Sequence, residues 1–197
     1  MNKIISYICM ILSELWEIFD YFLQLLPSRL GAFLRRIYFA IFLKVGKSFN
    51  VQTGVVIRGV PNITIGNFCS IMRNSSIYAR DAVLMIGDNF ACNENVMLGA
   101  DGGKLVIGHN VLIGPNTVIR VADHKFDNIE KNINLQGHNV GSIIIEDNVW
   151  ICSNVVITRG VKIGRGSVIG AGTVVTKDIP SNSVVVGSKA QIIKTRG

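Results

Sequence analysis

Aliphatic residues return at every sixth position over most of the chain from residue 51 onward. One frame holds six of them without a break, at Ile145, Ile151, Ile157, Ile163, Ile169 and Val175. Shorter runs precede it, at Ile65, Ile71, Ile77 and Val83 and at Ile107, Ile113 and Ile119. An amphipathic helix repeats about every 3.6 residues and a half-buried strand every two, so neither element explains a period of six. A hexapeptide period is typical of a parallel β-helix, in which each hexad supplies one short strand and one corner.

Three hexads close one triangular coil, and the repeated aliphatic residue points inward to stack on the coils above and below. Glycine often follows it, for example at Gly66, Gly87 and Gly108. We interpret glycine and asparagine at the corners as residues that tolerate a positive φ. The expected fold class is therefore all-β, a triangular hexapeptide-repeat solenoid. A β-sandwich with an accidental period would not hold one frame through six consecutive repeats.

The frame is interrupted in three places. It slips by three residues between Val83 and Ile86, and again across the glycine-rich stretch 99–106. The third interruption is much longer, because 26 residues separate Ile119 from Ile145. We expect residues 120–144 to leave the coil as a loop, since insertions in repeat proteins generally project from one face, often the working face. This loop contains the sequence RVADHKFDN.

Residues 1–48 follow a different pattern and are predicted to form an amphipathic helical segment, ahead of a β-helix with a C-terminal tail over residues 49–197. Residues 6, 13, 17, 20 and 24 are polar and form one narrow stripe on a helix whose remaining surface is mostly apolar, and Pro27 ends that helix. The segment from Arg29 carries only basic charges. Apolar bulk beside basic residues suits an anionic membrane interface, and packing on the β-helix or on a neighbouring subunit is the alternative.

The formal net charge of +7 favours anionic partners such as a phosphorylated ligand, an acidic membrane or nucleic acid. Nucleic acid is disfavoured, because the basic residues do not interleave with aromatic ones on one β-helical face. Three acids within residues 4–26 argue against a membrane-spanning helix and against a secretory signal. The four cysteines lie far apart without metal-like spacing, which favours free thiols. We therefore expect a cytoplasmic protein, peripheral at most on the inner face of the membrane.

Residues 145–187, IEDNVWICSNVVITRGVKIGRGSVIGAGTVVTKDIPSNSVVVG, resemble the left-handed β-helix acyltransferases of the hexapeptide-repeat superfamily. The resemblance covers about residues 60–194 and is to the group of galactoside, maltose, xenobiotic and polysaccharide O-acetyltransferases. The stretch follows the group's pattern of a W-I-G step, hexads, GAG, TKDIP and a terminal VVxG almost throughout. It departs from the pattern at Cys152, which replaces a glycine, and at GSKAQ, where GxPAK is usual.

This resemblance implies a homotrimer with acetyl-CoA in the groove between two adjacent β-helices. It implies that His124 acts as the general base, that Asn93 faces it across the active site, and that Asp101 binds the acceptor. Contacts with the cofactor are implied for Trp150 beside its thiol arm, for the backbone of Ala171, and for Thr176 and Lys177 further along. Lys194, beyond the last coil, suits charge-assisted contacts with the nucleotide phosphates.

Acetyl transfer from a thioester to a hydroxyl needs a base, and histidine can accept the proton and later return it to the leaving thiolate. No cysteine nucleophile is needed, and Cys69 and Cys92 are expected to fill interior positions. The function expected is O-acetylation of a sugar, a surface-polysaccharide or lipid-linked glycan precursor, without a metal.

Three other functions are alternatives to this one. The first is N-acetylation of a nucleotide-linked amino sugar, which would also need a base. The second is a zinc enzyme like the γ-class carbonic anhydrases, which the spacing of His109, His124 and His138 does not match. The third is a non-catalytic scaffold that presents membrane helices.

Overall fold

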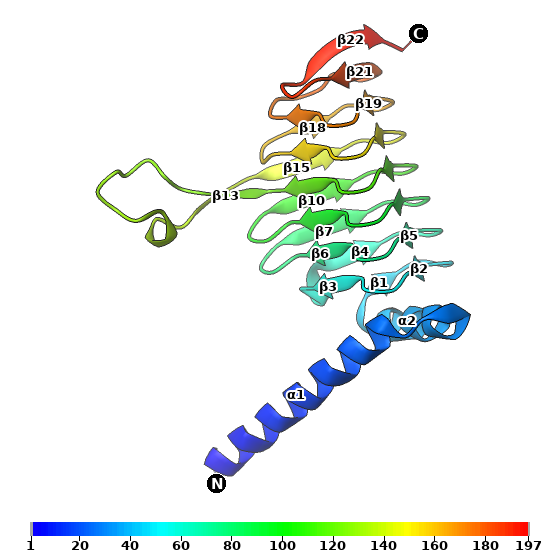
Figure 1. Cartoon of the computed structure of the whole chain (residues 1–197), viewed down its shortest axis with the longest axis vertical. Coiled ribbons are helices and arrows are strands. Elements are labelled where there is room, and N and C mark those ends of the chain that lie inside the picture. Colours follow the sequence, from blue (N-terminus) through cyan, green and yellow to red (C-terminus); the bar gives the residue numbers. More distant parts are fainter. Residues whose placement is uncertain (1, 197) are drawn as a thin grey trace.

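Two N-terminal helices precede a column of stacked short strands (Figure 1). The structure, a computed structural model, describes residues 2–196, without the side chains of residues 2–6, 8, 9, 12, 13, 16 and 17. Helix α1 spans Asn2–Leu25 and helix α2 spans Ser28–Phe42, so the helix break predicted at Pro27 is confirmed. No helix in the described part of the chain has the length and apolar character needed to cross a bilayer.

The strands form three faces of a prism, here called sheets A, B and C. Sheet A contains β1 (Lys44–Val45), β4 (Ile63–Ile65), β7 (Val83–Ile86), β10 (Lys104–Ile107), β15 (Ser142–Ile145) and β18 (Lys162–Ile163). Sheet B contains β2 (Asn50–Val51), β5 (Ser70–Ile71), β8 (Ala91–Cys92), β11 (Leu112–Ile113), β16 (Trp150–Ile151), β19 (Val168–Ile169), β21 (Ser183–Val186) and β22 (Gln191–Thr195). Sheet C contains β3 (Val56–Arg58), β6 (Ser76–Tyr78), β9 (Met97–Gly99), β12 (Val118–Arg120), β17 (Val156–Ile157) and β20 (Val174–Val175).

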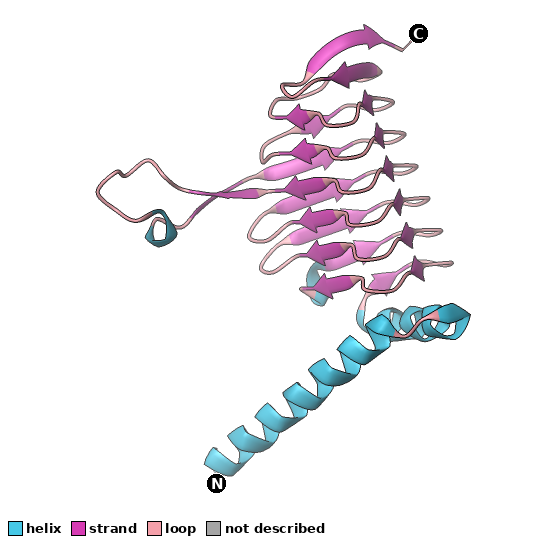
Figure 2. Ribbon diagram, viewed as in Figure 1, coloured by secondary structure: helices cyan, strands magenta, loops and turns pink. Residues whose placement is uncertain are grey.

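The chain visits sheets A, B and C in turn, and strands from successive coils pair in parallel, as Figure 2 shows. The antiparallel exceptions are β21 with β22, at the end of sheet B, and a hairpin of β13 (Ala122–His124) with β14 (His138–Val140). Two short 3₁₀ helices cover Val60–Asn62 and Ile133–Leu135. The predicted left-handed parallel β-helix is confirmed.

The interior is a set of aliphatic columns, as the six-residue period predicted. Ile113, Ile151 and Ile169 are stacked partners in sheet B, and all three are buried. The period placed Val83 among the inward residues. That prediction is wrong, because the Val83 side chain is 44% exposed. Strand β7 alternates outward and inward along its four residues, so Leu84 and Ile86 fill the interior there instead.

The corners contain two kinds of position, one that needs a positive φ and one that needs space for the next coil. Positive φ values occur at asparagines such as Asn89 (φ 57°), whose amide also donates to Asn110 Oδ1 at 3.1 Å. The glycine that follows the inward isoleucine is needed for space, since a Cβ at Gly87 would lie 2.7 Å from the carbonyl carbon of Gly108. The interpretation by positive φ therefore holds for the asparagines and for corner glycines such as Gly54, Gly166 and Gly172, and is wrong for Gly87.

Extra residues enter the coil at one edge only. Stacked residues Ile65, Ile86 and Ile107 are 21 positions apart, whereas Ile145 and Ile163 are 18 apart. The additions fall where sheet C leads into sheet A, at 79–82, at 100–103 and, most extensively, at 121–141. We call this edge the C–A corner, and name the A–B and B–C corners in the same way. The first coil begins at Lys44, inside the range 1–48 assigned to the helical segment.

Helix α2 lies against the first coil through a buried cation. Arg35 is 2% exposed and donates from Nε to the carbonyl of Val51 at 3.1 Å and from Nη1 to the carbonyl of Leu26 at 2.7 Å. The same nitrogen also reaches the carbonyls of Leu23 and Gln24. Burial lowers the pKa of this guanidinium, and the four carbonyl oxygens compensate for the water it has lost.

Candidate active site

The predicted base stands on a hairpin that leaves the C–A corner. Strand β13 follows β12 almost directly, and His124 at its end pairs with His138 of β14 (Figure 1). The two imidazole rings pack together with centroids 4.3 Å apart and an interplanar angle of 37°. Both histidines remain exposed to solvent. The long interruption therefore forms an ordered projection that carries His124 away from the body of the β-helix.

The hairpin is tied down at its base and at its tip. Asp123 forms an ion pair with Arg159 of the next coil, Oδ2 to Nε at 2.9 Å. At the tip, Gln136 Nε2 donates to the carbonyls of Asn128 and Lys131, at 2.8 and 2.7 Å. Because neighbouring side chains on a strand point to opposite faces, Asp123 points away from the ring of His124. Asp123 positions the hairpin and does not orient the imidazole.

A cavity of about 310 Å³ lies between the hairpin and the C–A corner. Its lining residues are Arg80, Asp81, Asp101, Gly102, Arg120, Ala122, His138 and Val140. Asp101, the predicted acceptor ligand, accepts a hydrogen bond from the backbone N–H of Arg80 at 2.8 Å through one oxygen, Oδ1. The sequence pattern assigned His138 no role in acetyl transfer, whereas the structure places it in the lining of this cavity together with Asp101. Its position follows from the hairpin register that pairs it with His124, and that register left no signal in the sequence.

The other predicted site residues lie elsewhere on the same chain. Asn93 directly follows β8 and stands exposed at the B–C corner, as does Ala171. Trp150 opens β16 and is exposed on sheet B. Thr176 and Lys177 follow β20 at the C–A corner, and Lys194 lies in β22. A strand of sheet C lies between the B–C corner, which carries Asn93, and the C–A corner, which carries the hairpin of His124. One strand and one corner span up to about 20 Å. A single chain therefore does not bring Asn93 together with His124.

The described cysteines are poor nucleophiles. Cys69 and Cys92 are buried, as expected, and Cys69, Cys92 and Cys152 are all free thiols. Burial raises the pKa of Cys92 to about 12 and also raises the pKa of Cys69 and Cys152. Each thiol is therefore protonated near neutral pH, and the thiolate is the reactive form. The side chain of Cys9 lies outside the described residues.

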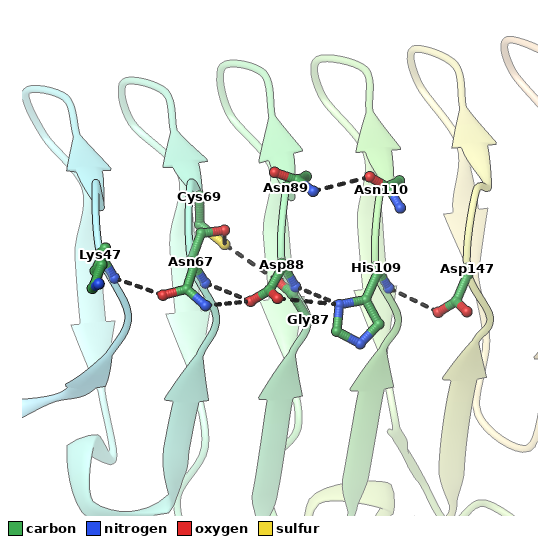
Figure 3. Close-up of polar contacts among 9 residues, drawn as sticks. All are labelled: Lys47, Asn67, Cys69, Gly87, Asp88, Asn89, His109, Asn110 and Asp147. Carbon is green, nitrogen blue, oxygen red and sulfur yellow. Dashed lines mark hydrogen bonds and ion pairs between the residues drawn. The ribbon is translucent and has the colours of Figure 1, made fainter.

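His109 belongs to a structural ladder along the A–B corner (Figure 3). The Nδ1 atom of His109 accepts a hydrogen bond from the backbone N–H of Asp88 at 2.9 Å. The backbone N–H of His109 donates to Asp147 Oδ1 at 2.9 Å. The ladder continues from Asp88 Oδ1, which accepts the backbone N–H of Asn67 at 2.7 Å. Within residues 2–196, no group of three or more His, Cys, Asp or Glu side chains is arranged to hold a metal ion. His109 is on a different corner from His124 and His138, so the three histidines do not form a zinc site.

A repetitive β-helix with one projecting histidine hairpin defines a protein of the hexapeptide-repeat class. Residues 142–177 match the family model described as bacterial transferase hexapeptide (six repeats). A galactoside O-acetyltransferase from Escherichia coli is 44% identical over 110 residues, which cover 55% of this chain and 52% of that protein. The chain spans about half the length of the curated relatives it matches.

Two solved structures are similar over a larger share of the chain. A hexapeptide-repeat acetyltransferase from Vibrio cholerae, complexed with acetyl-coenzyme A, is 30% identical with a TM-score of 0.59 and covers 82% of this chain and 75% of its own. A maltose O-acetyltransferase from Clostridium difficile is 30% identical with a TM-score of 0.65. It covers 89% of this chain and 81% of its own. The chain belongs to the hexapeptide-repeat acyltransferase superfamily.

Proposed function

We propose that this protein is an acetyl-CoA-dependent O-acetyltransferase that acts on a sugar hydroxyl. The observation that carries the proposal is the hairpin at the C–A corner of a hexapeptide β-helix, in which His124 pairs with His138, and His138 lines a polar cavity. The Vibrio cholerae relative, solved with acetyl-coenzyme A, supports the donor, and the maltose and galactoside O-acetyltransferases support a sugar acceptor.

In the proposed reaction, His124 takes the proton from the acceptor hydroxyl as its oxygen attacks the thioester carbonyl carbon. The carbonyl oxygen then carries negative charge and needs a donor, for which the Asn93 amide or a corner backbone N–H is suited. Collapse of the tetrahedral intermediate breaks the carbon–sulfur bond, and the imidazolium returns its proton to the leaving thiolate. His138, packed on His124, fixes the orientation of the ring.

The active unit is proposed to be a homotrimer. Asn93 and Ala171 stand at the B–C corner, whereas His124, Thr176 and Lys177 stand at the C–A corner. Two corners of one rigid prism cannot approach each other, but the B–C corner of one subunit can face the C–A corner of its neighbour. In that arrangement Trp150 and Lys194 also border the intersubunit groove, where the cofactor would lie.

The acceptor is proposed to be a surface-polysaccharide or lipid-linked glycan precursor, modified on the inner face of the cytoplasmic membrane. Asp101 keeps one carboxylate oxygen for a sugar hydroxyl, because only Oδ1 accepts the Arg80 N–H. Arg80 and Arg120 line the same cavity and have no ion pair among the described residues. Two unpaired guanidinium groups suit an acceptor that carries a carboxylate or a phosphate.

The test is release of free thiol from acetyl-CoA by the full chain on a panel of glycan acceptors. His124→Ala should lower the acceptor-dependent kcat by about 10²- to 10⁴-fold, the usual contribution of a general base. The matched control is His109→Ala, an exposed histidine on another corner, which should retain wild-type kcat. Equal kcat for wild type and His124→Ala would place the base elsewhere. An acetamide in place of an acetyl ester on the product would favour N-acetylation.

A further inference from the structure

The end of the polar stripe of helix α1 that the structure describes, at Asp20 and Gln24, faces the protein and not the solvent. Of the five residues of the stripe, the structure describes the side chains of Asp20 and Gln24, and both are buried. Gln24 Nε2 donates to Asp20 Oδ2 at 2.7 Å, and Asp20 lies 3.6 Å from Arg58 of strand β3. The side chains of Ser6, Ser13 and Glu17 lie outside the described residues. Glu14 lines a cavity between α1 and the first coils, together with Asp20 and Arg58.

Leu23 and Phe39 are buried, but many other apolar side chains of both helices are exposed. Phe22 is 65% exposed on α1, and Ile41 is 69% exposed on α2. Other large exposed apolar residues there are Tyr7, Ile11, Leu15, Ile18, Tyr21, Leu25, Leu30, Phe33 and Ile37. A surface helix of a water-soluble protein normally buries its apolar face and exposes its polar one. Here many large apolar side chains stay exposed while Asp20, Gln24 and Arg35 are buried, and the exposed apolar area is of the kind that marks an interaction site.

The two helices share one apolar groove of about 530 Å³. Its lining residues are Phe19, Phe22, Leu23, Leu26, Leu34, Ile37, Tyr38, Ile41 and Phe42. The helices meet at Pro27 and lie at the N-terminal end of the β-helix, with α1 extending away from it (Figures 1 and 2). We call this groove and the exposed apolar residues beside it the helical apolar surface.

Basic residues border the helical apolar surface. Arg29 and Arg36 are exposed on α2, and Lys44 and Lys47 follow it, with no ion pair from any of the four among the described residues. Residues 21–80 contain eight lysines and arginines and no acid. Two copies that met through this surface would bring these charges against their own counterparts, which is repulsive. An anionic lipid surface supplies both an apolar phase and the opposite charge.

We propose that the helical apolar surface inserts into the interface of an anionic membrane, with Phe22, Ile37 and Ile41 in the acyl region and the arginines among the headgroups. The hairpin of His124 leaves the fourth coil, three strand spacings or about 14 Å above the first. If the proposed function holds, the acetylated sugar is therefore held away from the lipid surface, as in a glycan extended from a lipid anchor.

The test is co-sedimentation of the full chain with vesicles, a measurement that needs no activity. Vesicles of phosphatidylcholine with phosphatidylglycerol should bind the chain, and vesicles of phosphatidylcholine alone should bind it much more weakly, with binding reduced by salt. Phe22→Glu should weaken binding about tenfold or more. Arg29→Gln with Arg36→Gln should weaken it about fivefold for each charge removed.

Two matched controls separate this surface from general stickiness. Phe68→Glu removes an aromatic side chain of similar exposure, 61%, from a β-helix corner. Lys104→Gln with Lys131→Gln removes two exposed basic charges elsewhere. Both should bind vesicles like wild type. Absence of binding to anionic vesicles would overturn the proposal, as would equal losses in the controls. Sedimentation without lipid compares the assembly sizes of wild type and Phe22→Glu. A larger assembly for wild type would mean that the helical apolar surface binds a second copy of the chain instead of lipid.

Discussion

Among the described residues, the β-helix buries no charged side chain, whereas the two N-terminal helices bury Arg35 and Asp20 together with the apolar Leu23 and Phe39. In the coils, Ile151 and its stacked neighbours point inward while Asp88 and similar acids stand at the corners. In the helices, Arg35 and Asp20 face the protein while Phe22 faces outward. A coil encloses an interior that apolar side chains must fill. A helix pair on the open end of the column encloses no such interior, so many of its apolar side chains stay exposed.

The largest expected difference between the two regions comes from truncating one apolar residue in each. Ile151→Ala should cost about 2–5 kcal/mol of unfolding free energy, because its side chain is fully buried between Ile113 and Ile169. Phe22→Ala should change the free energy of unfolding by less than about 0.5 kcal/mol in the absence of lipid. Urea unfolding followed by circular dichroism measures both. Comparable losses for the two variants would mean that Phe22 is covered by protein.

The next effect is local and concerns the buried cation. Arg35→Met leaves the carbonyls of Leu26 and Val51 without their donor, at a cost of about 2–3 kcal/mol. The loss should detach the helices and leave the coils intact, so hydrogen exchange should speed up in residues 2–42 and stay slow in the β-helix. Arg36→Met, which removes an exposed neighbour, is the control. Unchanged exchange in residues 2–42 of Arg35→Met would show that the helices dock by other contacts.

The smallest effect concerns a polar group at a corner. The backbone N–H of Asn67 is the main cause that holds the pKa of Asp88 below its ordinary value of 3.8, and the Asn67 amide and His109 add to it. Because the pKa of Asp88 is lower in the folded state, its carboxylate stabilises the fold at any pH above the ordinary pKa. That stabilisation is lost as the pH falls through the folded-state pKa. Asp88→Asn should therefore make stability less dependent on pH below about 4. Asp127→Asn, in the exposed loop, should leave the acid limb of the unfolding curve as in wild type.

Much of the fold was readable from the six-residue period, because each hexad adds the same strand and corner to the column. The period failed at Val83, where added residues at the C–A corner shift the frame and β7 resets it. It also gave Gly87 the wrong task, since the approach of Gly108 from the next coil lies 21 residues away in sequence. Contacts at that separation leave no local signal in the sequence.

The candidate site was less accessible to sequence reasoning. His124 was found through the interrupted repeat and the family resemblance, but its packing on His138 depends on hairpin register. The ion pair of Asp123 with Arg159 joins a loop to a later coil, and only the stacking of coils sets that distance. The separation of Asn93 from His124 follows from the corner each occupies.

The sequence by itself determined the inward columns, the break at Pro27, the place of the long excursion and the amphipathic character of the first helix. These features depend on spacing along the chain, and spacing is a local property. Only the tertiary structure decided which side of that helix meets the protein. Arg35 and Asp20 find their partners in Val51 and Arg58 of the first coil, and those contacts turn Phe22 and Ile41 outward. An amphipathic pattern defines two faces, and the neighbouring surface selects which one is buried.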